Sequence, residues 1–230
     1  MTIFRFTLIK GLRSPGTFVF NCILPLALIL IRPLWREGEV FISGFGLLIM
    51  IIWGGSFLMA QGILNDKADG AITRILSAPV SMFNYLVQNL FAFMVPMTVQ
   101  VAIVTVLGTI LYDWSLTIAL AVFLCYLVFT ISSVAMSFAW NCLFKSKDSS
   151  FSSFSALVTF GSFLSGAFVP IEAFPAGLQH VGAILPAYWA MRGLNAISGY
   201  GLTGGYWLAI LAMLLFTIAF LLYGGKRRII

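Results

Sequence analysis

Charged side chains are scarce in this sequence, where Asp, Glu, Lys and Arg together make up 9% of the 230 residues. A soluble domain usually has about one quarter of its residues charged. Hydrophobic residues account for 61% of the chain, and its mean hydropathy is +1.05. Water therefore cannot be the main solvent of this chain, and the composition predicts an integral membrane protein.

Catalytic and metal-binding side chains are also rare. His180 is the single histidine, and the nearby Glu172 does not complete a metal site or an acid–base pair. No charged residue is expected at mid-membrane depth, which argues against an intramembrane enzyme and against a proton pump built on buried carboxylates. The three cysteines, Cys22, Cys125 and Cys142, lie in or at the ends of apolar runs, which argues against a disulfide framework or a zinc site. We expect no enzyme activity and no resident cofactor or metal.

Nucleotides and nucleic acids are disfavoured as ligands for two further reasons. The sequence lacks a G-x-x-x-x-G-K-[ST] phosphate loop, so the chain does not bind and hydrolyse ATP in that way. The net charge of +6 comes from 13 basic against 7 acidic residues, but the basic residues are scattered among apolar runs instead of forming a stripe. No nucleic-acid partner is expected from that distribution.

Six apolar runs are each long enough to cross a bilayer, whose hydrocarbon core needs roughly 20 residues of helix. They predict an all-α integral membrane protein with six transmembrane helices, forming one membrane domain over residues 1–230. The runs are 17–35, 40–64, 83–111, 115–143, 150–171 and 204–224.

Two further segments have apolar character without spanning length. Residues 1–13 place apolar side chains near one helical face and basic ones mostly on the other, which predicts a helix lying in the membrane interface. Residues 172–203 are apolar but broken by Pro175, Pro186 and several glycines. That stretch predicts short re-entrant or interfacial helices on the outer side.

Basic residues set the expected orientation, because Lys and Arg are retained on the cytoplasmic side of a membrane. Ten of the 13 basic residues fall on one side of the predicted spans and three on the other. Both termini are therefore expected in the cytoplasm. The three outer basic residues are Arg32, Arg36 and Arg192.

The longest polar break on the cytoplasmic side is residues 65–81, NDKADGAITRILSAPVS. Its apolar residues recur at helical spacing, which predicts a short amphipathic helix just outside the membrane. Such a helix is a natural docking element for a partner protein. The pattern fits a helix resting on lipid headgroups equally well.

This segment resembles the cytoplasmic loop of the type 2 ABC permease family, which includes drug-resistance, nodulation-factor and polysaccharide exporters. Asp66, Gly70, Leu76 and Pro79 match the family's pattern, whereas Ala71 stands where Thr is common. A second stretch, residues 165–194, resembles the family's outer segment between its last two spans. The matching residues there are Ser165, Gly166, Pro170, Pro175, Leu185, Pro186 and Tyr188.

The resemblance implies a permease subunit of an ABC exporter in a bacterial cytoplasmic membrane. Two permease copies, as a homodimer or pseudo-dimer, would assemble with two separate ATPase subunits, and those subunits would bind ATP and Mg. The cargo would be an amphipathic, hydrophobic or lipid-linked compound such as a drug, peptide, lipid or glycan. The residues expected to couple the chain to the ATPase are Asp66, Gly70, Ile72, Ile75, Leu76 and Pro79.

Small and hydroxylated residues recur at three- and four-residue steps along the fifth run, a pattern that lets helices approach closely in lipid. The stripe predicts either a substrate path or dimer seam, as the fifth span forms in the family, or ordinary packing within one subunit. Gln100, an amide deep in the third run, is the best candidate for the wall of the same path, and an interhelical hydrogen bond is its structural alternative. The stripe consists of Ser152, Ser155, Thr159, Ser162 and Gly166.

Two other functions stay open. A secondary transporter or channel would need ion-coupling groups, helices broken at the midplane or pore-lining charge, and the sequence has little of these. A regulatory or sensing membrane subunit of an ABC ATPase would have the same spans and the same docking segment.

Overall fold

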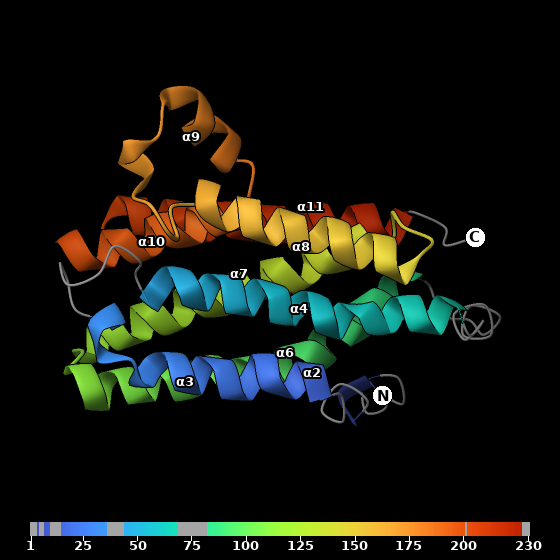
Figure 1. Cartoon of the computed structure of the whole chain (residues 1–230), viewed down its shortest axis with the longest axis horizontal. Helices are drawn as coiled ribbons and strands as arrows, with labels where there is room; N and C mark the ends of the chain where they lie inside the picture. Colours follow the sequence, from blue (N-terminus) through green and yellow to red (C-terminus); the bar gives the residue numbers. More distant parts are fainter. Residues whose placement is uncertain are drawn as a thin grey trace.

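The computed structural model describes residues 4, 7–9, 15–35, 44–68, 82–200 and 202–226, and every regular element among them is a helix. The long helices run side by side in one bundle (Figure 1). Both chain ends and the end of the α4 helix (Gly44–Ala68) lie at the same end of this bundle. The described part of the chain is therefore all-α, as predicted.

Within the described residues, four helices are long and apolar enough to cross a membrane. These are α4, α6 (Met82–Tyr112), α7 (Leu116–Asn141) and α11 (Gly204–Lys226). An α-helix pairs most of its backbone groups within itself, as a segment surrounded by lipid must. They correspond to the second, third, fourth and sixth predicted runs.

The first run forms a shorter and less regular helix than predicted. It consists of α2 (Pro15–Phe18), the π-helical turn η1 (Val19–Ile23) and α3 (Leu24–Leu30), and we call these three elements the first helix. The backbone leaves the helix at Ile31, where ψ is 86°, because the ring of Pro33 would clash with a carbonyl four residues earlier. A 3₁₀ turn, η2 (Arg32–Trp35), follows.

The fifth run also differs from its expected bounds. Helix α8 (Lys147–Leu164) begins three residues before the predicted run 150–171 and ends seven residues short of it. The chain reverses at Gly166, whose φ of +87° is a conformation that favours glycine. Because α8 begins with charged residues and serines, it is too polar to be one of the four helices that are apolar enough to span a membrane.

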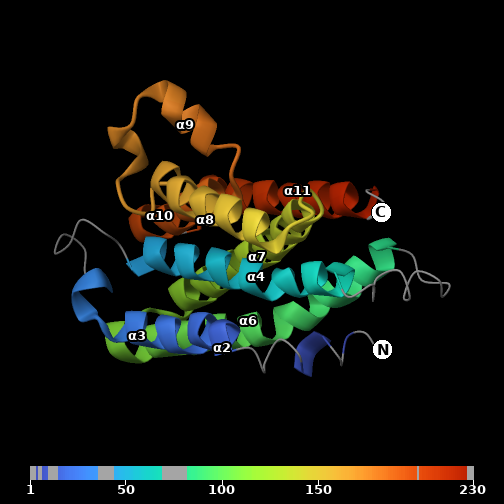
Figure 2. The same cartoon turned by 45° about the vertical axis from the view of Figure 1, so that its right-hand side comes forward.

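Three short helices occupy the stretch for which broken helices were predicted. They are η3 (Ile171–Ala173), α9 (Ala176–Gly182) and α10 (Pro186–Tyr200). Pro175 and Pro186 stand at the starts of α9 and α10, where the missing N–H of proline has no cost. Helix α9 stands away from the bundle, whereas α10 packs against α11 and α7 (Figures 1 and 2).

Helix α7 is the centre of the bundle, with α4, α6, α10 and α11 packed around it. All of its residues 132–139 are buried. Tyrosine hydroxyls in this core find carbonyl partners, as buried tyrosines usually do. Tyr126 donates to the Phe45 carbonyl oxygen at 3.0 Å, and Tyr206 donates to that of Ala121 at 2.8 Å.

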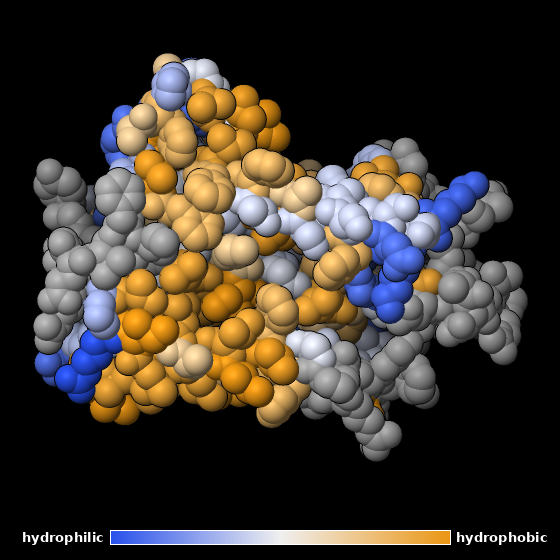
Figure 3. All heavy atoms as spheres, in the orientation of Figure 1, coloured by the Kyte–Doolittle hydropathy of each residue, from blue (hydrophilic) through white to orange (hydrophobic). Residues whose placement is uncertain are grey.

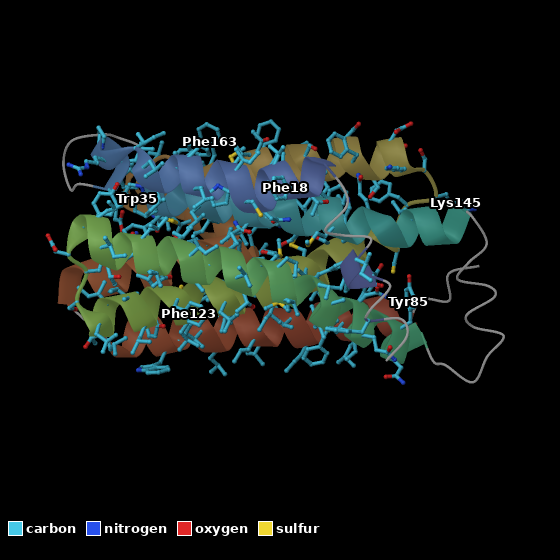
Figure 4. The ribbon with its side chains drawn as sticks, turned by 90° about the horizontal axis from the view of Figure 1, so that it is seen from below. Phe18, Trp35, Tyr85, Phe123, Lys145 and Phe163 are labelled. Carbon is cyan, nitrogen blue, oxygen red and sulfur yellow. The ribbon has the colours of Figure 1, made fainter. Side chains whose placement is uncertain are left out.

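The surface carries an apolar band between two more polar ends (Figure 3). Lys145 and Tyr85 lie at one end of the bundle and Trp35 at the other (Figure 4). Trp35 packs against Phe45, Tyr112 and Trp114, with ring centroids 5.2 to 6.0 Å apart. Aromatic clusters of this kind are typical of a helix bundle near a membrane–water boundary.

Candidate functional site

Stacked aromatic rings hold α8 against α4. The rings of Phe57 and Phe154 are nearly parallel, with centroids 4.0 Å apart, and Trp53 meets Phe154 edge-on at 6.3 Å. Gly161 makes room for the Trp53 ring, because a Cβ at that position would lie 2.8 Å from the ring. A small residue therefore allows the close approach of the two helices.

Beside this contact lies a cavity of about 360 Å³, which we call the α4–α8 groove. The size is within the range of small-molecule sites, roughly 300 to 1,000 Å³. Among the described lining residues, the two that carry hydroxyl groups are Ser155 and Thr159. The Thr159 hydroxyl donates to the Ser155 carbonyl oxygen at 2.9 Å. The other lining residues are Phe20, Leu24, Leu47, Met50, Ile51, Gly54, Phe57, Leu58, Phe151, Phe154 and Val158.

The small and hydroxylated residues of the predicted stripe lie in different surroundings. Ser155 and Thr159 line the α4–α8 groove, and Ser152 is exposed near the start of α8. Ser162 is completely buried, and its hydroxyl has no hydrogen-bond partner in the part of the chain that the structure describes. Gly166 lies beyond the helix in the turn. The stripe is therefore not one continuous surface.

Gln100 does not join the stripe. It is buried in α6 and lines a second cavity of about 300 Å³, which we call the η1–α6 cavity. The first helix stands between the two cavities: Phe20 and Leu24 face the groove, and Asn21 and Pro25 face the second cavity. The residues proposed for one path thus lie in two separate places.

Asn21 is a buried polar residue that the sequence reasoning missed. It is buried in η1 beside the η1–α6 cavity, and neither atom of its side-chain amide has a hydrogen-bond partner among the described residues. The signal was present in the sequence, because an amide inside an apolar run, four residues before Pro25, is costly unless something pairs with it.

The arrangement of long apolar helices around α7 agrees with the resemblance of the sequence to the type 2 ABC permease family. The family model for the ABC-2 family transporter protein covers residues 38–225. The chain belongs to the ABC-2 family. No curated protein matches it. As a member of this family, it is a multi-pass membrane protein and the permease of an ABC transporter, a transport domain that associates with an ABC ATPase.

Most of the ABC-2 chain's predicted coupling residues lie outside the described residues. These residues are Gly70, Ile72, Ile75, Leu76 and Pro79. The backbone of Asp66 belongs to α4, which continues to Ala68. The helix therefore extends into the segment 65–81, and the roles of these residues stay predictions.

Polar contacts tie other segments to the end of the permease where both termini lie. Thr7 donates a hydrogen bond to the Asn89 side-chain oxygen at 2.8 Å, and the Asn89 amide donates to the Tyr85 carbonyl oxygen at 2.9 Å. Ser150 donates to the Asn141 side-chain oxygen at 2.8 Å. Asn89 therefore fixes Thr7 beside α6, and Asn141 fixes the start of α8 beside the end of α7.

Proposed function

We propose that this chain is the membrane-spanning subunit of an ATP-driven exporter that moves an amphipathic, hydrophobic or lipid-linked compound out of a bacterial cell. The α4–α8 groove carries the proposal. Its lining is apolar apart from two hydroxyl-bearing side chains, a surface suited to cargo of that character. None of the described residues that line it is charged. Outward transport rests on the resemblance to exporters.

We further propose that the first helix and α8 complete six spans with the four long helices. Both run alongside α4 (Figures 1 and 2). Helix α8 has 18 residues, which at 1.5 Å per residue gives about 27 Å. That length is slightly less than the roughly 30 Å of the hydrocarbon core, so the turns that follow each helix would complete the crossing.

The proposed assembly has two permease copies and two cytoplasmic ATPase subunits that hold ATP and Mg. Both termini would face the cytoplasm, and residues 65–81 would transmit ATPase closure to the spans. Ile72, Ile75 and Leu76 would form the docking face. A second copy packed at the α4–α8 groove would enclose the groove between the two chains and shield it from lipid.

Affinity purification of the tagged chain from its native membrane in mild detergent tests this proposal. We expect an ATPase with a phosphate loop to co-purify, identified by mass spectrometry, together with measurable ATP hydrolysis. The variant Leu76→Asp should insert normally and lose transport-coupled ATPase activity, because it puts a charge on the docking face.

Ser77→Asp is the matched control, since it places the same charge one residue away on another face of the predicted helix, and it should retain coupling. A functional chain that is stably extracted and repeatedly purifies alone would overturn the proposal and favour a secondary transporter. ATPase association without transport of any cargo would favour a regulatory or sensing subunit.

A further inference from the structure

Two buried amides in the membrane domain have no hydrogen-bond partner among the described residues. The side chains of Asn21 and Gln100 are each 3% exposed, and the nitrogen and oxygen of both amides are unpaired. Burying an unpaired amide costs free energy wherever water is absent. Native proteins rarely keep such groups without a reason.

Both amides line the same space, the η1–α6 cavity of about 300 Å³. That volume is at the lower end of the range for small-molecule sites. Together the amides offer hydrogen-bond donors and acceptors inside otherwise apolar walls. The remaining lining residues are Phe18, Cys22, Pro25, Leu26, Pro96, Val99, Ile103 and Val104.

Two prolines explain why the helices leave a space here. Pro25 has no N–H to donate to the Asn21 carbonyl, and its ring crowds that carbonyl. The helix widens into the π-turn η1, in which the Leu24 N–H bonds to the Val19 carbonyl oxygen. Pro96, four residues before Gln100, lies inside the continuous helix α6 and likewise has no N–H to donate to the carbonyl four residues before it. Single π-turns inside helices occur frequently at functional sites.

The cavity opens toward the lipid-facing surface. Phe18, Val99 and Ile103 line it and are also exposed, whereas the two amides are buried. None of the described lining residues is charged. A ligand that fits must therefore be neutral and largely apolar and must carry a group that both donates and accepts hydrogen bonds.

We propose that the η1–α6 cavity is a binding site, entered from the bilayer, for a lipid-soluble molecule whose neutral amide or hydroxyl group pairs with Asn21 and Gln100. The site lies on the opposite face of the first helix from the α4–α8 groove. Binding there does not require the groove to be the transport path.

Photolabelling of the purified chain in lipid nanodiscs tests this site. The probe is a medium-chain primary amide with a diazirine in its alkyl chain, and its comparison is the same diazirine hydrocarbon without the amide. We expect the amide probe to label peptides from residues 18–26 and 99–104 about tenfold more than the hydrocarbon, as one good hydrogen-bonded contact would produce.

The double variant Asn21→Leu with Gln100→Leu should reduce amide-probe labelling to the level of the hydrocarbon. Its unfolding temperature should not fall, because replacing unpaired buried amides by apolar groups is neutral or stabilising. Asn89→Leu is the matched control, since the Asn89 amide is paired with Thr7 and Tyr85. That variant should unfold at a lower temperature and keep its labelling.

A milder variant moves one amide without removing it. A Cβ at Gly55 would lie 2.5 Å from the Asn21 side-chain oxygen, so Gly55→Ala should turn that amide away and lower the labelling. Gly62→Ala on the same helix meets no described atom within 4 Å and should leave labelling unchanged.

Equal labelling by the two probes, or labelling that survives the double variant, would overturn the proposal. A double variant that unfolds at a much lower temperature would also overturn it, because the amides would then be paired by ordered water in the free protein. Since the readout is binding, failure of the export proposal would leave this result unaffected.

Discussion

At Gly46, α4 comes close to the backbone of Ala167. A Cβ there would lie 2.6 Å from the Ala167 Cα and 2.7 Å from its carbonyl carbon. Backbone atoms cannot move aside as the end of a flexible side chain can. Because Ala167 directly follows the turn at Gly166, this single glycine allows the chain leaving α8 to pass across the start of α4.

Gly46→Ala should therefore lower the free energy of unfolding by about 1–3 kcal/mol, the usual cost of overpacking a closely packed site. Thermal unfolding in detergent would measure the change. Gly62→Ala is the control on the same helix, where nothing lies within 4 Å, and it should be neutral or slightly stabilising because alanine is the better helix former. Identical unfolding temperatures for the two variants would show that Ala167 does not constrain Gly46.

The stripe residues of α8 lie on two faces of the helix instead of the single one that the sequence predicts. At 3.6 residues per turn, positions three residues apart lie about 60° apart around an α-helix, and positions four apart lie about 40° apart. Thr159 consequently lines the α4–α8 groove, and Ser162 is completely buried. Gly166 falls outside the helix because α8 ends at Leu164.

Leucine substitutions at these two positions should separate groove function from folding. Thr159→Leu should leave the unfolding temperature nearly unchanged and impair transport or assembly of two copies, since it narrows the groove. Ser162→Leu should lower the free energy of unfolding by about 1–3 kcal/mol, because it forces carbon atoms into a packed site.

Ser162→Ala should be harmless, because the hydroxyl has no hydrogen-bond partner to lose. Transport assays in vesicles, combined with thermal unfolding, would distinguish these effects. Normal transport and normal assembly of the Thr159→Leu variant would remove the groove from the proposed path.

The whole molecule has two distinct ends separated by an apolar band (Figure 3). Lys145 marks the end that also holds both termini, and Trp35 marks the opposite one (Figures 1 and 4). The excess of basic residues predicts that the first of these ends faces the cytoplasm.

Cysteine labelling would test this orientation. In a background without the native cysteines, Arg32→Cys should react with a membrane-impermeant maleimide in intact spheroplasts. Lys145→Cys should react only after the membrane is permeabilised. Both positions are exposed, so access to the reagent depends on the side of the membrane. Labelling of Lys145→Cys in intact spheroplasts would reverse the orientation.

Membrane insertion, the approximate positions of the long helices and the family could be predicted from the amino acids alone. A helix in lipid pairs its own backbone groups, so any long apolar run identifies a span without knowledge of its neighbours. The ends of the first and fifth runs were less predictable. Pro33 and the turn at Gly166 end those helices inside the predicted runs.

Which side chains share a site emerged only with the packed bundle. Asn21 and Gln100 are 79 positions apart in the sequence and meet at one cavity, while Ser162 and Thr159, three positions apart, face different surroundings. Helices in lipid are apolar on every side, so hydrophobic periodicity does not tell which face meets a neighbour. Which face meets a neighbour depends on where small residues let helices pack closely and on how the helices bend. Both are known only from the packed structure.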